Sequence, residues 1–396
     1  MNAADNPRAN RIVYMDNNAT TRVAPEVVDA MIPFFRDYWG NPSSMHTFGG
    51  RVAADIERAR QQVAALIGAA DPSEIIFTSC GTESDNMAVR GAVDACGGYP
   101  HVVTTRVEHP AVLGVCRYLE SRGCRLSELG VDADGRLNLD ELREALTART
   151  AVVSVMWANN ETGVVFPIEE IAAMVKNAGV LFHTDAVQVP GKMPIDVRKV
   201  PVDMLSLSGH KLHAPKGIGV LYVRKGTKVN SLLLGGHQEG GKRAGTENVP
   251  YIVGLGKACE LAMEHLEEET TRVAALRDRL EEGILATCPD TRVNGDRANR
   301  LPNTTNISFE FIEGESILLH LDALGVAASS GSACTSGSLE PSHVMRAMGV
   351  PFTAAHGSIR YSLSRYNTEE DVDYVIEQMP PIIQRLREIS PFVGAK

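Results

Sequence analysis

Short apolar runs and helical stretches alternate along the chain from about residue 55 onward. Residues 54–68 have apolar positions at helical spacing and end on Gly68, a residue typical of helix C-termini. Six runs are predicted as strands: EIIFTS (74–79), HVVTTR (101–106), TAVVSVMW (150–157), VLFHTDA (180–186), DMLSLS (203–208) and GIGVLYV (217–223). Several are apolar throughout, as strands buried on both faces are. Since helices such as 168–179 lie between some of them, the pattern predicts a mostly parallel sheet with right-handed crossovers.

The pattern changes near residue 254. Residues 254–287 are charged and amphipathic, and they predict one long helix that leads to a second domain. Beyond it come two strand-like runs at 304–311 and 357–364, with a serine- and glycine-rich loop between them, and a final helix at 369–389. We therefore predict a large domain of residues 16–262 and a small α+β domain of residues 1–15 and 263–396.

Length, charge and composition argue against several classes of protein. At 396 residues the chain is too long for one compact core. Its net charge of −10 argues against a nucleic-acid partner, which needs a basic face. No apolar run has the length of a membrane span and residues 1–11 lack the apolar core of a signal peptide, so we expect a cytoplasmic protein without a membrane partner. The seven cysteines form no C-x-x-C pair and no His/Cys ligand spacing, which predicts free thiols and no metal site.

The first candidate for a catalytic residue is a lysine. Ser208, His210 and Lys211 directly follow an apolar strand, and open α/β sheets bind ligands beyond the carboxyl ends of their strands. A lysine whose neighbours are Ser, Gly and His suits a Schiff base with an aldehyde cofactor. The alternative is an ordinary surface lysine after a strand.

An aspartate at the end of another buried strand favours the cofactor. Asp185 follows an apolar run, with Gln188 three residues later. A carboxylate there could keep the pyridine nitrogen of pyridoxal phosphate protonated, so that the ring serves as an electron sink. The alternative for Asp185 is a helix N-cap.

These residues fit a known family. The pattern D-A-x-Q followed by S-G-H-K resembles the fold-type I pyridoxal-phosphate enzymes of the aminotransferase class V group. Seven further motifs are similar to those of the cysteine desulfurases from end to end: YMDNNATT, GNPSSMHTFG, FTSCGTESDN, EHPAVL, NNETGVV, RAGTENV and SSGSACTSGSLEPSHVMRAMG. Within that family the chain looks closest to the nitrogenase-associated branch. The resemblance implies an α/β fold with a mostly parallel seven-stranded sheet in a large pyridoxal-phosphate-binding domain, plus a smaller α+β domain.

The resemblance also implies how the cofactor is held. Gly81 and Thr82 lie at a strand-to-helix turn, where backbone N–H groups favour an anion. Thr82, Ser208 and His210 would bind the phosphate, and Thr246 would reach it from the partner subunit of a homodimer. A plain helix cap is the alternative for Thr82.

Further residues would contact the ring and the substrate. By resemblance, His109 stacks on the ring and can move protons, and its ordinary pKa near 6.5 would allow both close to neutral pH. Gln188 would donate a hydrogen bond to the phenolic oxygen of the cofactor. Arg360 would bind the carboxylate of the amino-acid substrate, helped by Asn160, because a guanidinium matches carboxylate geometry. The ordinary alternatives are a structural histidine and a surface salt bridge.

Cys334 lies in SSGSACTSGS, a stretch whose serines and glycines bury little and leave the backbone free. The catalytic cysteine of the family occupies this position. The resemblance implies that Cys334 takes sulfur from L-cysteine as a persulfide, leaves L-alanine, and passes the sulfur to an iron–sulfur scaffold protein, as nitrogen fixation requires. Since a free thiol is only a few per cent ionised at neutral pH, we expect His109 to assist it. The other six cysteines, including Cys80 beside the phosphate loop, are expected to pack.

Other interpretations stay open from sequence alone. The chain could be a different pyridoxal-phosphate enzyme, such as a selenocysteine lyase or an aminotransferase, or a scaffold without catalysis. Residues 236–243 nearly spell a phosphate-binding loop, but Arg243 stands where the magnesium-binding hydroxyl belongs, so we reject an ATPase. Residues 131–142 resemble a calcium loop but lack its acidic spacing, and we predict a turn leading into a helix.

Overall fold

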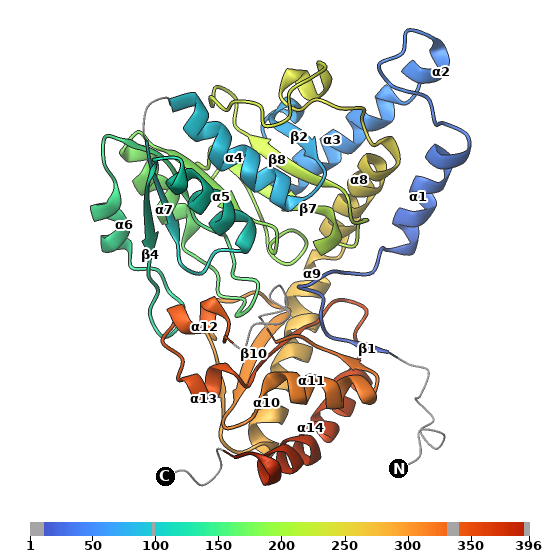
Figure 1. Ribbon diagram of the computed structural model, residues 1–396. Coiled ribbons are helices and arrows are strands. Elements are labelled where there is room, and N and C mark those ends of the chain that lie inside the picture. The colour runs from blue at the N-terminus through green and yellow to red at the C-terminus, as the bar shows by residue number, and fades with distance from the viewer. Residues whose placement is uncertain (1–11, 97–99, 331–339, 392–396) are drawn as a thin grey trace.

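The computed structural model describes residues 12–96, 100–330 and 340–391 of the chain (Figure 1). A larger part is built around a seven-stranded sheet, and a smaller part around a three-stranded antiparallel sheet. The prediction of an α/β fold with a mostly parallel seven-stranded sheet is confirmed. Among the described residues, no helix combines the length and the apolar character that crossing a membrane would require.

The large sheet directs most of its carboxyl ends to one edge. Its strands are β2 (Ile75–Thr78), β3 (His101–Thr105), β4 (Arg125–Leu129), β5 (Thr150–Ser154), β6 (Leu181–Asp185), β7 (Met204–Ser208) and β8 (Gly219–Val223). They lie in the order β2-β8-β7-β6-β5-β3-β4. Only β8 runs against its neighbours β2 and β7, and every other adjacent pair is parallel. The segments that follow the other six strands therefore meet at the same edge of the sheet.

Helices cover both faces of this sheet, which explains why its central strands are apolar throughout. In β5, Val152 packs into one hydrophobic cluster and the next residue, Val153, into another. The cluster around Val152 is completed by α4 (Gly81–Cys96) and α5 (Pro110–Ser121). The cluster around Val153 is completed by α1 (Pro25–Arg36), α3 (Ala53–Ile67), α7 (Ile168–Asn177) and α8 (Val249–Glu264).

The hydrophobic pattern missed the edge strand β4. Its sequence is RLSEL, and only Leu129 is buried. An edge strand faces solvent on one side and needs few apolar residues, so neither alternation nor a continuous apolar run marks it.

The smaller part has a core of its own. It contains β9 (Thr291–Val293), β10 (Thr304–Phe309), β12 (Ser358–Ser362), α10 (Ala274–Thr287), α11 (Gly314–Ala323) and α14 (Glu369–Ile389). The two-residue strand β1 (Val13–Tyr14) pairs in parallel with β11 (Val326–Ala327) and adds Val13 and Met15 to this core. The N-terminal segment thus runs from the smaller part into the larger one.

The predicted long helix at 254–287 is interrupted, and the expectation of one continuous helix is wrong. α8 ends at Glu264 and is followed by the short α9 (Leu266–Glu268), a π-helical turn at Glu269–Val273, and α10. In Figure 1, α9 lies between the larger and the smaller part. Ala262 still packs into the larger core, whereas Val273 packs into the smaller one.

Four short helices complete the described chain: α2 (Thr47–Gly50), α6 (Leu139–Ala145), α12 (His343–Ala347) and α13 (Phe352–Ala355). The segment that resembles a calcium loop is a turn in which Asp132 Oδ1 accepts hydrogen bonds from the backbone of Asp134 and Arg136. It leads into α6, so the prediction of a turn before a helix is confirmed.

Candidate active site

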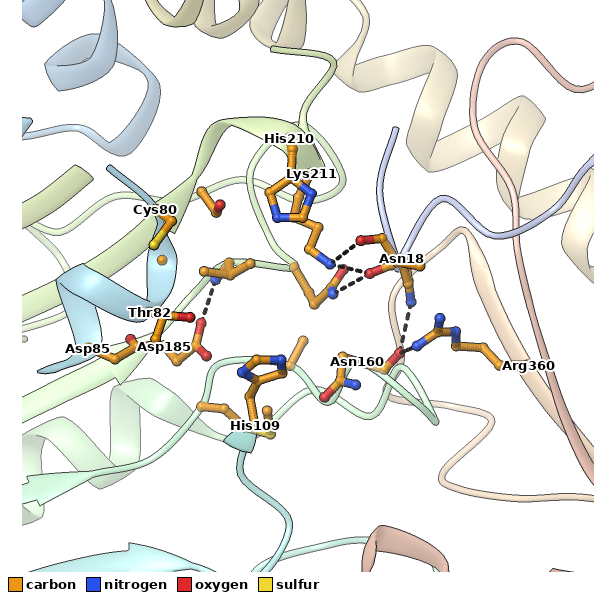
Figure 2. Close-up of a pocket in the computed structure, with 17 residues that line it drawn as sticks. Asn18, Cys80, Thr82, Asp85, His109, Asn160, Asp185, His210, Lys211 and Arg360 are labelled. Carbon is orange, nitrogen blue, oxygen red and sulfur yellow. Dashed lines mark hydrogen bonds between the residues drawn. The ribbon is translucent and has the colours of Figure 1, made fainter. Parts of the chain in front are cut away.

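A cavity of about 410 Å³ opens at the carboxyl edge of the large sheet (Figure 2). The segments after β2, β3, β5, β6 and β7 all contribute to its wall, together with β12 of the smaller part. It brings together ten of the residues that the sequence singled out: Gly81, Thr82, His109, Asn160, Asp185, Gln188, Ser208, His210, Lys211 and Arg360. Thr246 is exposed and lines a different pocket, and Cys334 lies outside the described residues.

Lys211 ends the short helical turn Gly209–Lys211 that follows β7. Its ammonium group donates hydrogen bonds to the backbone oxygens of Asn18 and Ala19, the latter at 2.8 Å. Burial, together with the positive charges of Arg360 and Lys192, lowers the pKa of Lys211 to about 7. A lysine that loses its proton this easily is a nucleophile and a base near neutral pH.

Asp185 is the last residue of β6 and is buried. Its Oδ1 accepts a hydrogen bond of 2.9 Å from the backbone of Val187, which closes a tight turn rather than capping an α-helix. The helix-cap alternative is therefore excluded. Burial raises the pKa of Asp185 to about 6, against the lowering effect of Lys211. A cationic ring nitrogen beside this carboxyl would stabilise its ionised form.

A glycine allows the turn at the start of α4, which the sequence predicts to bind phosphate, to pack closely. A Cβ atom on Gly81 would lie 2.9 Å from Val187 Cγ2 and 3.3 Å from Ser208 Cβ. Only glycine therefore lets this turn approach the segments after β6 and β7. Thr82 is the second residue of α4, inside the helix rather than before it, so its hydroxyl is not a plain N-cap.

His109 is the N-cap of α5, and its Nδ1 accepts a hydrogen bond of 3.1 Å from the backbone of Ala111. The neutral ring therefore carries its proton on Nε2. Burial lowers the pKa of His109 to about 4, with smaller effects from Lys211 and His343. The lowered pKa differs from the expectation that His109 titrates near neutral pH, because burial favours the neutral ring, whose Nε2–H is then available to donate.

Arg360 lies in β12 with only 3% of its surface exposed, so the alternative of a surface salt bridge is excluded. One guanidinium nitrogen donates to the backbone oxygen of Asn160 at 2.9 Å, and the other donates to Asp16 Oδ1 at 2.8 Å. Its Nε is buried without a hydrogen-bond partner among the described residues. Figure 2 shows the side chain beside Asn160 and Asn18.

Comparison with known proteins agrees with this geometry. Residues 13–375 match the profile of the family described as aminotransferase class-V. The chain belongs to this family. It is 61% identical over 381 residues to a cysteine desulfurase of Trichormus azollae, which covers 96% of this chain and 95% of that protein. It is 60% identical over 380 residues to the cysteine desulfurase NifS of Azotobacter vinelandii, covering 96% and 94%.

A solved structure of a NifS-like protein is also similar. It has a TM-score of 0.89 and 40% identity, and the match covers 95% of this chain and all of the other. The predicted resemblance to the cysteine desulfurases, and to NifS among them, is confirmed. Family membership makes the chain an enzyme that uses pyridoxal phosphate, so the alternative of a scaffold without catalysis is excluded.

The residues present fit this cofactor. The wall of the cavity offers a lysine amine for the aldehyde, a buried carboxyl for the ring nitrogen and a glycine turn at a helix N-terminus for the phosphate. Two buried wall atoms, Gln188 Oε1 and Asp85 Oδ1, have no hydrogen-bond partner among the described residues. Gln188 Nε2 donates one of its two N–H groups to the backbone oxygen of Asn18 at 3.0 Å. Donation by Gln188 to the phenolic oxygen stays a prediction.

Sequence reasoning missed several wall residues. Asn18 lines the cavity, and Asp16 does not line it but binds Arg360. Both stand in the quoted motif YMDNNATT, but their partners Lys211 and Arg360 are far away in the chain and nothing local indicates the contact. Asp85 is buried in α4, three residues after Thr82. Cys80, which was expected only to pack, is half-buried and lines the cavity. Its position beside the phosphate turn was the available signal.

Proposed function

We propose that this protein removes sulfur from L-cysteine with the help of pyridoxal phosphate, and yields L-alanine and a persulfide on Cys334. One observation carries the proposal: a lysine amine and a buried arginine line the same cavity, which also contains a carboxyl suited to the ring nitrogen. This set matches an α-amino acid bound by its carboxylate, with its Cα near a base.

When bound, the cofactor supplies an electron sink for the bond that breaks at the substrate Cα. Asp185 would hold the ring nitrogen, and Thr82, Ser208 and His210 would hold the phosphate. His109 would lie against the ring. Lys211 would hold the cofactor covalently and, once displaced by the substrate amine, would take the Cα proton as a neutral amine, since its pKa is lowered to about 7.

Arg360 would bind the substrate carboxylate, and Asp16 would orient the guanidinium for it. The backbone oxygen of Asn160 fixes one side of Arg360, which leaves the Asn160 amide for the substrate. A guanidinium held on two sides loses less side-chain entropy when a carboxylate arrives.

The sulfur step rests on the sequence around Cys334. Its thiolate would attack the substrate sulfur, so that a sulfur–sulfur bond forms while the carbon–sulfur bond breaks and its electron pair stays with the carbon. Protonation of that carbon gives alanine. His109 would assist by donating from Nε2 rather than by accepting a proton, because its pKa is lowered to about 4.

We further propose a homodimer in which Thr246 completes the phosphate site of the partner subunit. Thr246 is exposed and lies outside the cavity of its own chain. Large apolar side chains are also exposed on the same part of the molecule, among them Trp39 (70%) and Met45 (104%) near α2 and Leu234 (86%). An exposed apolar surface of this kind is typical of a subunit interface.

The finer assignments follow from the relatives. The 60% identity to NifS supports an iron–sulfur scaffold as the sulfur acceptor and a role in nitrogen fixation in the cytoplasm. We assign residues 16–262 to the cofactor domain, and residues 1–15 and 263–396 to a small domain that carries the Cys334 loop.

A product assay tests the proposal. The protein is incubated with L-cysteine and pyridoxal phosphate, and alanine and sulfide are quantified. We expect equal amounts of both in the presence of a reductant, loss of both in Cys334→Ala, and no change in Cys96→Ala, whose thiol is exposed at the end of α4. 3-Mercaptopyruvate in place of alanine, or full activity of Cys334→Ala, would instead indicate an aminotransferase. Activity only when L-selenocysteine replaces L-cysteine would indicate a selenocysteine lyase.

A further inference from the structure

A second lysine is buried behind Lys211. Lys192 lies in the loop after β6, only 5% exposed, and its ammonium donates a hydrogen bond of 3.1 Å to the backbone oxygen of Gln188. That loop packs against α8 at Gly191, where an added Cβ would lie 3.1 Å from Ala262 Cβ. The hydrogen bond to Gln188 therefore holds the ammonium group of Lys192 in the protein interior, where burial lowers its pKa to about 8.

Lys192 and Lys211 share a small cavity of about 20 Å³. This volume is enough for a single water molecule. The charged and titratable groups around it come from four segments: Lys211 and His213 after β7, His265 at the end of α8, Glu269 in the π-helical turn, and Arg365 after β12. Arg360 does not line this cavity, but its positive charge also acts on Lys192. Around this small cavity, the positively charged groups thus outnumber the carboxylate of Glu269.

Glu269 supplies that negative charge from the junction between the two parts of the molecule. It is 5% exposed, and its Oε1 accepts a hydrogen bond of 3.1 Å from the backbone of Arg365. The π-helical turn that starts at Glu269 buries both this residue and Val273. Such turns occur often at functional sites.

We propose that Lys192 is a positioning residue for the reaction: its buried charge, balanced by Glu269, keeps the nitrogen of Lys211 from holding a proton too firmly. A like charge nearby disfavours a second cation, whether that cation is the free ammonium or the protonated nitrogen that joins Lys211 to the cofactor. Burial, Arg360 and Lys192 all lower the pKa of Lys211, in that order, whereas Asp185 and Asp16 raise it. The inference rests on the role proposed above for Lys211 as a base.

A pH titration of the holoenzyme tests it. The visible absorbance of the cofactor bound to Lys211 is recorded against pH for Lys192→Met, Lys192→Arg and Lys199→Met, where Lys199 is 81% exposed. We expect the midpoint to rise by about one pH unit in Lys192→Met. It stays in place in Lys192→Arg, which keeps the charge, and in the control Lys199→Met. An unchanged midpoint in Lys192→Met, or an equal rise in the control, would overturn the proposal.

Two further measurements keep the test decisive. Lys192→Met leaves buried Glu269 with only the charge of Arg365 to offset it. The double variant Lys192→Met/Glu269→Gln should therefore unfold at higher denaturant concentration than the single variant, while its midpoint stays above that of the parent. In cofactor-free protein, acylation of Lys211 is followed by mass spectrometry as a function of pH. The midpoint of this pH dependence should also be higher in Lys192→Met than in the parent. Neither measurement needs turnover, so a failed sulfur assay would not be mistaken for failure of this inference.

Discussion

The guanidinium of Arg360 is fixed before any substrate arrives. Asp16 and the backbone of Asn160 hold two of its nitrogens, and the residue is buried. Its role could be predicted from sequence only through the resemblance, because a single arginine in a strand-like run has no local mark of function. Asp16 could not be predicted at all, since it lies 344 residues away from the arginine that it orients.

Replacing Arg360 with lysine should weaken substrate binding. Lysine keeps the charge but loses the planar fork, and a charge-assisted hydrogen bond is worth about 1.5–3 kcal/mol, so we expect kcat/KM for L-cysteine to fall roughly tenfold to a hundredfold. Steady-state kinetics with Arg346→Lys, whose side chain is exposed, is the matched control. Equal kinetic constants for the two variants would show that Arg360 does not bind the substrate.

At the scale of elements, strand ends and helix starts position the reactive groups. The apolar runs predicted β2, β3, β5, β6, β7 and β8 within a few residues, because strands buried on both faces have few polar positions. β4 escaped prediction because only Leu129 of its five residues is buried. The break near residue 265 escaped because charged helical periodicity continues across it. The start of α5 places His109, and the start of α4 places Gly81 and Thr82.

His109 caps α5 and is also proposed to act in the reaction through its ring. Two substitutions separate the capping role from the role of the ring. Asparagine is a good N-cap, whereas alanine is a poor one and costs about 1 kcal/mol. We expect His109→Asn to unfold like the parent, His109→Ala to unfold at lower denaturant concentration, and both to form the persulfide more slowly. Rapid-quench mass spectrometry gives that rate, while cofactor affinity should change less. If His109→Asn forms the persulfide at the same rate as the parent, the role of His109 is limited to capping α5.

Gly81 should be intolerant of even a methyl group. The added Cβ would press on Val187 and Ser208, and overpacking of this kind costs about 1–3 kcal/mol. We expect Gly81→Ala to weaken pyridoxal-phosphate binding and to lower the melting temperature of the holoenzyme.

The control for this prediction is Gly114→Ala in the middle of α5. Nothing lies within 4 Å of its added Cβ, so the substitution should stabilise the protein by roughly 0.5–1 kcal/mol and leave cofactor affinity unchanged. Identical behaviour of the two variants in calorimetry and cofactor titration would contradict the close approach at Gly81.

At the scale of the molecule, the cavity is shared between the larger and the smaller part. Lys211 comes from one part and Arg360 from the other, and the N-terminal segment with Asn18 links them. The sequence pattern predicted six of the seven strands of the larger sheet and two of the three strands of the smaller one, but neither β4 nor β9. It could not predict how the parts meet, because those contacts join polar side chains to backbone oxygens and have no periodicity.

If Thr246 serves the partner subunit, two defective variants should restore each other. Thr246→Ala impairs phosphate binding and Lys211→Ala cannot hold the cofactor, yet a mixed dimer contains one site with both residues intact. After denaturation and refolding of an equal mixture, about a quarter of the sites should be intact, because half of the dimers are mixed. Activity at limiting cofactor measures them. If the mixture is no more active than the separate variants, Thr246 does not cross to a partner.

The most direct test of the account is the mass of one peptide. Trypsin releases residues 301–346 as a fragment whose only cysteine is Cys334. After a brief incubation of the holoenzyme with L-cysteine and digestion without reductant, we predict that this fragment gains one sulfur atom in the parent and none in Lys211→Ala. Alanine formation without an added sulfur on this fragment, or with the sulfur on another cysteine, would contradict the account.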